Sequence, residues 1–342
     1  MEETPLAGGK KIIVILLIIL TTVGILSFYF LRTFFVPPPI AAPNQTVSPV
    51  NADGEKFTEG KALLHSDSDA SLRILKSLAA DQKADPYYRA RAIAFLANLS
   101  GYFSQTDVIN KLFSGDIWGD FYHPGESTRG IAEDIDLAKK KAYEWSLGLA
   151  PTALANQRIA WWHVRQLQDD RSLSPQVREQ YLSLIKERIA SNEQILKNDI
   201  ALGMNLNELQ TIYLIEGLIN GSGMYLQTHE SEYKQRAINA YEKAIGIDPI
   251  GALLGSYQLA NLLRITEGKN QEERIHELLD FVVNSYKAYP NSFVYNHFTK
   301  ERSDAHKLHT HTQDLIDTAV FYPPFRDLLI ELGWPLERFK TK

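Results

Sequence analysis

The sequence predicts an all-α protein, and three observations carry that prediction. Apolar residues recur at helical spacing through most of the chain after residue 66. Residues that cap or open helices, such as Asp67 and the pair Asp85-Pro86, stand directly before periodic segments. No segment alternates apolar and polar residues between hairpin turns, and the best strand candidate, residues 280–286, lies within a longer helical period.

An uncharged apolar run predicts one further helix, which spans a membrane. The run begins at Ile12 and ends at Leu31. As a helix it would extend about 30 Å, the thickness of the hydrocarbon core of a bilayer. The alternative is a cleaved signal peptide, whose apolar core has only about 7–15 residues and ends at small residues. Because Arg32 and then Phe34 follow the run, we expect a retained anchor in contact with the lipid bilayer.

Flanking charges predict the orientation of this helix. Lys10 and Lys11 precede the run, whereas Arg32 alone follows it closely. An excess of basic residues on the N-terminal side places that side in the cytoplasm and the bulk of the chain outside it. The predicted organisation is a cytoplasmic tail at residues 1–9, a transmembrane helix at 10–35, a Pro-rich linker at 36–61 and a helical repeat domain at 62–342.

Composition narrows the function. The formal net charge is -5, and the first 35 residues carry a net positive charge, so the soluble part is acidic. This argues against nucleic acid as a partner, because a phosphate-binding face needs clustered Lys and Arg. The chain has no cysteine, which excludes disulfides, thiolate metal sites and cysteine catalysis. An exported domain without disulfides suggests a bacterial protein.

Residues 36–61 are rich in Pro, Asn, Ser and Thr and show no apolar period that could pack. The run Pro37-Pro38-Pro39 favours polyproline conformation, a semi-rigid stalk of about 3 Å per residue. We therefore expect a linker here. A first helix is expected to be capped at residues 67–69 and to run through Leu72, Ile74, Leu75 and Leu78. Further helices are expected at residues 87–103, 131–149, 152–169, 175–200, 207–227, 230–246, 251–266, 271–289, 304–321 and 325–332.

Two of these helices end alike. Residues 142–151 (AYEWSLGLAP) and 240–249 (AYEKAIGIDP) share Ala, Tyr, Glu, Gly and Pro in the same places. The pattern resembles the second helix of a tetratricopeptide (TPR) repeat. The residues at the family's small, aromatic, small and terminal proline positions are Ala237, Tyr241, Ala244 and Pro249. Small residues let the helices of a hairpin touch, and proline stops the helix.

The resemblance implies an α-solenoid of TPR-like helical hairpins with a concave binding face. It covers about residues 207–290, and the two matching prolines lie farther apart than the family period of about 34 residues. A generic helical bundle is the alternative. In this family first-helix residues line the concave face, so the resemblance implies Asn220, Gln258 and Asn261 as partner-binding candidates.

Residues 115–130 (GDIWGDFYHPGESTRG) form a helix-breaking insertion rich in aromatic and acidic side chains. Long loops between helices are often functional. Trp118 and Tyr122 are candidate partner contacts in this loop, and Asp120 or Glu126 is the candidate acid of a glycan-cleaving enzyme. The alternative is that the aromatic residues fold back and seal one end of the helical stack.

Trp161 and Trp162 are adjacent on one expected helix. Adjacent helical positions point about 100° apart, so we expect one ring in the core and the other near the surface. Trp162 is the candidate contact.

Histidines gather near the C-terminus at positions 306, 309 and 311. His306 and His309 share a helical face, but His311 points about 200° away from His309. At most two imidazoles converge, so no metal site is predicted.

The sequence contains no phosphate-binding glycine loop, His-Glu-x-x-His motif, Gly-x-Ser-x-Gly motif or dinucleotide-binding fingerprint. We expect a non-enzymatic protein without a cofactor, a membrane-anchored scaffold that binds proteins or peptides in a bacterial cell envelope. Its layout resembles that of an ancillary subunit of the secretion translocon, which suggests envelope assembly or handling of exported proteins. The alternatives are a cell-wall glycan-acting enzyme and a purely structural tether.

Overall fold

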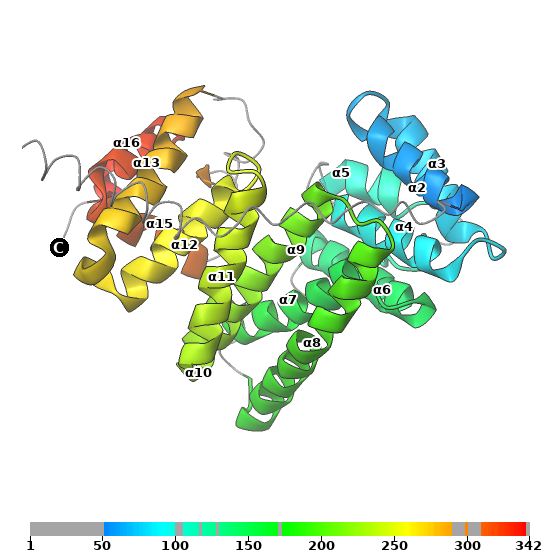
Figure 1. The fold of residues 1–342 in the computed structure, drawn as a ribbon, viewed down its shortest axis with the longest axis horizontal. Helices are drawn as coiled ribbons and strands as arrows, with labels where there is room; N and C mark the ends of the chain where they lie inside the picture. Colours follow the sequence, from blue (N-terminus) through cyan, green and yellow to red (C-terminus); the bar gives the residue numbers. More distant parts are fainter. Residues whose placement is uncertain are drawn as a thin grey trace, which may run out of the picture. The chain divides into compact units, whose positions relative to one another are not determined.

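The computed structural model describes residues 51–99, 105–115, 118–127, 130–169, 173–288, 298–299 and 309–339. These residues form helices and no strand, which confirms the all-α prediction for this part of the chain (Figure 1). None of the described helices is long and apolar enough to cross a membrane. The predicted anchor, residues 12–31, and the tail before it lie outside the described residues, so the anchor stays a prediction.

The α-helices of the described part carry the labels of Figure 1. They are α2 (Ala52–Ala62), α3 (Ser68–Ala80), α4 (Pro86–Asn98), α5 (Gln105–Asp107), α6 (Ile131–Leu149), α7 (Ala153–Asp169), α8 (Pro175–Ala201), α9 (Leu206–Leu218), α10 (Leu226–Thr228), α11 (Ser231–Ile247), α12 (Leu253–Thr266), α13 (Glu272–Ala288), α15 (His309–Phe321) and α16 (Pro323–Glu331). A π-helical segment, η4 (Ile219–Tyr225), continues α9.

Local sequence explains where these helices begin. The side chains of Asp67 and Asp85 accept hydrogen bonds from the backbone of the first turns of α3 and α4, at 2.9 and 2.8 Å. Asn205 and Glu208 form a reciprocal capping box at the start of α9. Each interaction satisfies a backbone N–H that has no partner within its helix.

One boundary of the sequence prediction is wrong. Residues 52–61, which were assigned to the linker, form helix α2. Its single large apolar side chain, Phe57, is 2% exposed and packs edge-to-face on Phe95 of α4. Gly60 lies so close to α3 that a Cβ there would be 2.7 Å from the Cγ of Leu75. A helix that packs through one aromatic ring and a glycine has no apolar stripe, which is why periodicity missed it.

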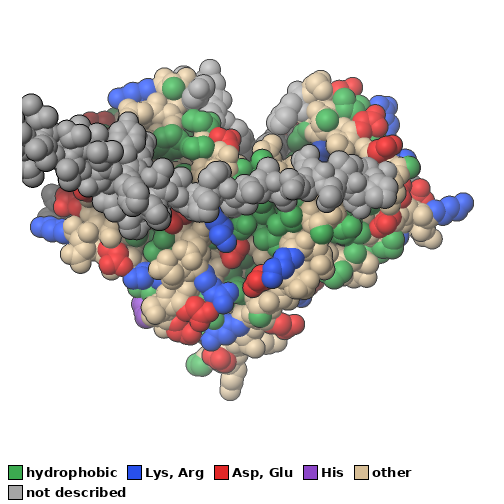
Figure 2. All heavy atoms as spheres, viewed as in Figure 1, with side chains coloured by type: hydrophobic (Ala, Val, Ile, Leu, Met, Phe, Trp, Pro, Cys, Tyr) green, Lys and Arg blue, Asp and Glu red, His purple; other side chains and the backbone are tan. Residues whose placement is uncertain are grey.

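Successive helices pack against one another as neighbouring pairs. α4 contacts α6, α7 contacts α8, α9 contacts α11, α12 contacts α13, and α15 contacts α16. Further contacts join α6 to α7, α7 to α9 and α11 to α12. The fold is therefore that of a helical-repeat-like all-α protein. On the face drawn in Figure 2, acidic and basic side chains are interspersed among the described residues.

Candidate binding crevice

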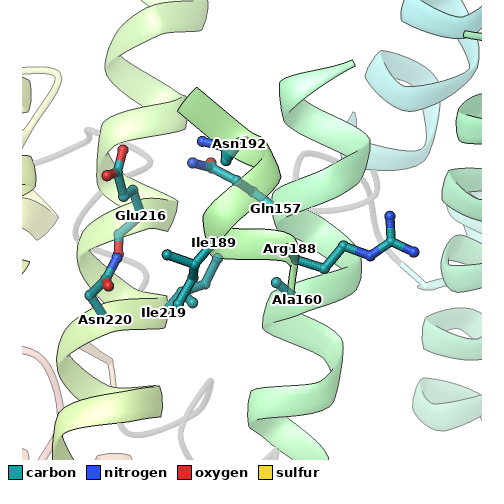
Figure 3. A pocket seen from close by; sticks show the side chains of 8 residues that line it. All are labelled: Gln157, Ala160, Arg188, Ile189, Asn192, Glu216, Ile219 and Asn220. Atoms are coloured by element: carbon teal, nitrogen blue, oxygen red, sulfur yellow. The ribbon is translucent and has the colours of Figure 1, made fainter. Parts of the chain in front are cut away.

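A polar crevice lies where α7, α8 and the junction of α9 with η4 meet (Figure 3). α7 contributes Gln157 and Ala160, and α9 with η4 contributes Glu216, Ile219 and Asn220. The remaining lining residues are Arg188, Ile189 and Asn192 of α8. The space for the centre of a water molecule is about 10 Å³, which admits roughly one water-sized group.

Hydrogen bonds fix α8 against α7 on one side of the crevice. The side-chain amide of Asn156 donates to the backbone oxygen of Arg188 at 2.9 Å and to Asn192 Oδ1 at 3.3 Å. The guanidinium of Arg188 donates back to Asn156 Oδ1 at 3.3 Å. Asn156 is fully buried and Asn192 is nearly so. These buried hydrogen bonds therefore fix the position of α8 relative to α7.

Glycines bring the π-helical segment close to α7 on the other side. A Cβ at Gly223 would lie 2.5 Å from a methyl group of Val164, so only glycine fits there. Gln168 also donates to the backbone oxygen of Ser222 at 2.9 Å. The sequence predicts one continuous α-helix over residues 207–227, but in the structure this helix becomes π-helical at Ile219. π-Helical segments inside helices are frequent at functional sites.

Buried amide groups without a protein partner line the crevice. Gln157 is 3% exposed, and neither its amide nitrogen nor its amide oxygen has a hydrogen-bond partner among the described residues. Asn220 is fully buried; its Nδ2 donates to the backbone oxygen of Glu216 at 2.8 Å, while its Oδ1 has no partner there. Burying a polar group without a partner costs about 1–3 kcal/mol, so these amides are costly groups that the fold retains beside the crevice.

Glu216 is the acidic group of the crevice. It is partly buried, and within the described part of the chain its carboxylate has neither an ion pair nor a hydrogen-bond donor. Burial raises the pKa of Glu216, and the more distant charges of Lys243 and Arg236 offset only part of that effect. Lys243 lies over the ring of Tyr213, 5.2 Å from its centroid, and Arg236 pairs with Glu232 at 2.7 Å.

A second hollow lies at the turn between α12 and α13. Residues Lys269 to Glu277 supply its whole lining, and every lining residue is exposed. It is an open surface formed by one stretch of chain, whereas the crevice joins three elements and contains buried polar groups.

The predicted site residues fall in different places. Asn220 lines the crevice but is fully buried, contrary to the surface position expected for a concave face. Gln258 is half-buried on α12, and Asn261 is 6% exposed, where it accepts hydrogen bonds from Arg264 and Thr318 at 2.7 and 3.3 Å. Asn261 is therefore an interior residue, contrary to the surface position expected for a concave face.

The loop aromatics are packed inward. Trp118 is 3% exposed and contacts the rings of Phe113, Phe121 and Trp145, with centroids 5.9–6.4 Å apart. Tyr122 is half-buried against the same cluster. The surface role expected of Trp118 is therefore wrong, and the alternative, aromatics folded back onto the helices, describes the loop.

The remaining candidates are the two loop carboxylates, proposed as a catalytic acid, and the adjacent tryptophans, one of which was proposed as a partner contact. Asp120 is exposed, and Glu126 pairs with Lys141 at 2.7 Å. Trp161 and Trp162 are both half-buried, so the expected division into a core and a surface ring is wrong. The ring of Trp162 packs against Tyr181 of α8 and under the ammonium of Lys140.

The three C-terminal histidines cannot be compared with the prediction, because His306 and the side chains of His309 and His311 lie outside the described residues. Among the residues that are described, no group of three potential metal ligands converges. No metal centre is assigned.

Sequence reasoning missed Gln157, Glu216 and Arg188. One signal was available, because Glu216 is the single charged residue between Leu209 and Thr228. A lone carboxylate in such an apolar helix must find a partner, reach solvent or line a site. The sequence around Gln157 contains no such signal. Its amide lacks a hydrogen-bond partner only because of the way α8 and η4 pack around it.

The fold and the crevice define a helical-repeat-like protein with a polar recess between neighbouring helix pairs. Comparison of the chain with known protein families, with curated proteins and with solved structures found no match.

Proposed function

We propose that this chain is a membrane-anchored scaffold that binds a segment of another protein through its helical domain. The anchor is the apolar run from Ile12 to Leu31. The binding part is the helical unit Ser48–Lys342, whose described helices pack as successive neighbours. Stacked helix pairs suit binding, because each pair adds surface to one continuous face.

Contacts around Tyr241 support a TPR-like arrangement of α9, α11 and α12. Tyr241 is 1% exposed, and a Cβ at Gly217 of α9 would lie 2.4 Å from its ring. The same ring is 3.8 Å from the position of a Cβ at Gly255 of α12, so it fills the junction of the three helices. Ala237, one turn earlier, faces Gly221 of η4. Contacts of this kind between small and aromatic residues support the proposed TPR-like arrangement.

The observation that carries the proposal is the crevice. Gln157 and Asn220 hold buried amide atoms without a partner among the described residues, and a polypeptide backbone carries N–H and C=O groups that match them. Burial raises the pKa of Glu216, and the charges of Lys243 and Arg236 offset only part of that rise. A bound segment would complete these interactions, which the fold leaves open.

A photo-crosslinking experiment tests the binding function. A photoreactive side chain replaces Ile189, which lines the crevice, in the full-length chain expressed in its host. The matched control position is Glu187, an exposed residue that points about 200° away on the same helix. A discrete adduct at position 189, absent at 187 and weakened by Gln157→Leu, is expected. Identical adducts at both positions, or none at either, would count against binding here.

Membrane orientation needs its own measurement. A single cysteine at Ser48 of this cysteine-free chain can be probed in intact cells with a membrane-impermeant thiol reagent. Labelling is expected, because the proposed location of the helical domain is outside the cytoplasm of a bacterial cell. Labelling only after lysis would reverse the orientation and make the protein a scaffold on the cytoplasmic face.

The glycan-acting enzyme and the purely structural tether remain hypotheses. No observation on the described residues favours either one over binding. Loss of activity on cell-wall fragments in Asp120→Ala and Glu126→Ala variants that still fold would support the enzyme.

A further inference from the structure

We propose that α3 and α4 form a groove that binds a helix of a partner protein, and that α2 is an internal ligand which occupies this groove and can leave it. The partner helix would carry an aromatic residue, a glycine three positions later and a lysine directly after the glycine. This groove is separate from the crevice between α7, α8 and η4. The inference therefore goes beyond the proposed function and adds a second binding surface, which the chain itself can close.

α2 docks on α3 and α4 through very few side chains (Figure 1). Its buried residues are Gly54, Phe57 and Gly60, and the residues between them are exposed. The ring of Phe57 packs edge-to-face on Phe95 of α4, with centroids 6.1 Å apart. The inward face of α2 is therefore one aromatic ring between two glycines, and this pattern describes what the groove accepts.

An acidic group of α9 lies at one end of the groove. The carboxylate of Glu208 pairs with the ammonium of Lys61 at 2.9 Å. The same ammonium lies 5.4 Å from the ring centroid of Phe57 and 5.6 Å from that of Phe95. A carboxylate beside an aromatic ring suits a lysine, because its ammonium donates to the carboxylate and is attracted to the face of the ring. The groove is thus complementary to a helix with a basic residue one turn after its aromatic residue.

The groove is complete without α2. Arg91 of α4 donates to both carboxylate oxygens of Glu208, at 2.9 and 2.7 Å, and α3 packs directly on α4. Glu208 also accepts from the backbone N–H of Asn205 at 3.1 Å. Departure of α2 therefore leaves this carboxylate paired and places Lys61 in water. Burial lowers the pKa of Lys61, Glu208 offsets only part of this and Arg91 lowers it further, so docking does not favour its charged form.

α2 is a weak helix by itself. It has 11 residues and includes Gly54 and Gly60, whereas isolated helices shorter than about 12–15 residues are marginal in water even when they are rich in alanine. Glycine also lowers the stability of a helix relative to alanine. Undocking and unfolding of α2 are therefore coupled, and α2 should open before α3 and α4 do. A partner helix that needs less ordering can compete with it.

The two ends of α2 are held differently. At its start, the backbone N–H of Asp85 donates to the side chain of Asp53 at 2.9 Å. At its end, a closed turn leads into α3, in which the backbone N–H groups of Ser66 and Asp67 donate to the backbone oxygen of Leu63 at 3.1 and 2.7 Å. α2 can unfold while this turn stays closed, but exchange of α2 with a second copy would have to open the turn as well. The structure therefore favours a partner helix as the other occupant.

The test uses the purified full-length chain in detergent micelles. The probe is a fluorescein-labelled, alanine-rich helical peptide with Phe, Gly and Lys at the spacing of Phe57, Gly60 and Lys61, and fluorescence anisotropy measures its affinity. Phe57→Ala weakens the internal ligand and leaves the groove unchanged, so it should raise the affinity of the probe at least tenfold over wild type. Lys56→Ala, on the exposed face of α2, is the matched control and should change the affinity less than twofold.

Variants of the probe identify what the groove recognises. Replacing its phenylalanine by alanine should weaken binding to the Phe57→Ala chain at least tenfold, and replacing its lysine by norleucine at least threefold. Replacing its glycine by leucine should also abolish binding, because even a Cβ at Gly60 would lie 2.7 Å from Leu75 Cγ.

A disulfide can lock α2 in the groove. Gly60→Cys and Leu75→Cys are added to the Phe57→Ala chain, in which they are the only cysteines. The short distance between a Cβ at position 60 and Leu75 Cγ places the two positions within the reach of a disulfide. The oxidised chain should not bind the probe, and reduction should restore binding. Melting temperatures show whether both forms fold.

Hydrogen exchange on the wild-type chain tests the departure of α2 without any substitution. The amides of α2 should exchange through an opening of lower free energy than those of α3 and α4, and an excess of the probe should speed exchange in α2 alone. Equal protection of the three helices would show that α2 opens only with the rest of the fold, which overturns the inference.

The other outcomes are equally decisive. Equal affinity of the probe for wild type, Phe57→Ala and the oxidised chain, or no binding to any of them, would overturn the inference. A disulfide-linked dimer formed by mixing a Gly60→Cys chain with a Leu75→Cys chain would make a second copy the occupant and overturn the partner assignment. Crosslinking at Ile189 tests the crevice separately, so failure of the groove leaves the proposed function standing.

Discussion

Arg91 of α4 and Glu208 of α9 are 117 residues apart in the sequence, yet one guanidinium nitrogen of Arg91 donates to both carboxylate oxygens of Glu208, at 2.9 and 2.7 Å. Lys61 at the end of α2 binds the same carboxylate at 2.9 Å. The side chains of all three residues are less than one-fifth exposed. Glu208 therefore connects the first helices of the described part to the middle of the chain.

A second long-range contact lies beside this ion pair. The hydroxyl of Tyr87 donates to Asp199 at 3.0 Å, and the other oxygen of Asp199 accepts from the backbone N–H of Ala153 at 2.8 Å. Asp199 is 1% exposed. α4, α7 and the end of α8 are thus held together by buried polar contacts as well as by apolar packing.

Glu208→Gln should destabilise the fold strongly. The substitution leaves Arg91 and Lys61 buried without a carboxylate, and breaking a buried pair from one side costs about 3–5 kcal/mol. Urea unfolding of residues 48–342 measures this loss. Glu193→Gln, which breaks the exposed pair with Lys197, is the matched control and should leave the unfolding free energy almost unchanged. Equal effects of the two variants would contradict the structural role of Glu208.

The same carboxylate should make the fold sensitive to acid. Burial acts to raise the pKa of Glu208, but Arg91 and Lys61 outweigh it and hold that pKa below its usual value. A carboxylate with a lowered pKa in the folded state stabilises the fold above its unfolded pKa, and the contribution is lost as pH falls. Stability of the wild type should therefore fall below about pH 4, and Glu208→Gln should lack this component of the fall.

Asp314 should have the opposite pH dependence. Burial raises the pKa of this α15 carboxyl to about 6, with Arg264 lowering it and Asp317 raising it. Between about pH 4 and 6 the folded state holds a proton that the unfolded state has released, so this group makes stability fall as pH rises. Asp314→Asn should then stabilise the protein by about 2 kcal/mol at pH 7 and have little effect at pH 4. A pH-independent difference in urea unfolding would refute the shift.

Gly217→Ala tests the contact between α9 and α11. The new Cβ would lie 2.4 Å from the ring of Tyr241, which is fully enclosed and cannot move aside. Overpacking of this kind costs about 1–3 kcal/mol. Gly246→Ala on α11 is the matched control, because a Cβ there meets nothing within 4 Å; it should stabilise the helix by about 0.5–1 kcal/mol. Thermal melts of both variants distinguish the clash from the general preference of helices for alanine.

Trp118→Ala tests whether the loop of residues 115–130 is held by its core. Removing a buried aromatic ring costs about 3–5 kcal/mol. Trp118→Phe should cost much less, because it keeps a ring and removes an indole N–H that has no partner among the described residues. Chemical denaturation compares the two. Stability unchanged in Trp118→Ala would return this residue to the surface role first expected of it.

The sequence by itself determined the helical class and most of the helix limits. α6 has the predicted limits, residues 131–149, and caps such as Asp85 are read from two or three adjacent residues. These features are local, because a helix depends on the period of its own apolar residues and on the groups next to its ends. The apolar run from Ile12 to Leu31 is equally legible, and its role remains a prediction.

Tertiary structure alone decided what each side chain faces. Helical period could not show that Trp118 and Asn261 point inward, that Phe57 makes α2 part of the fold, or that Gln157 and Asn220 meet Glu216 at one crevice. Each of these outcomes depends on contacts with residues far away in the sequence. The ion pair of Glu208 and the close approach of glycines to Val164 and Tyr241 are long-range contacts of the same kind. Burial and pairing are properties of several helices packed together, and a single segment does not contain them.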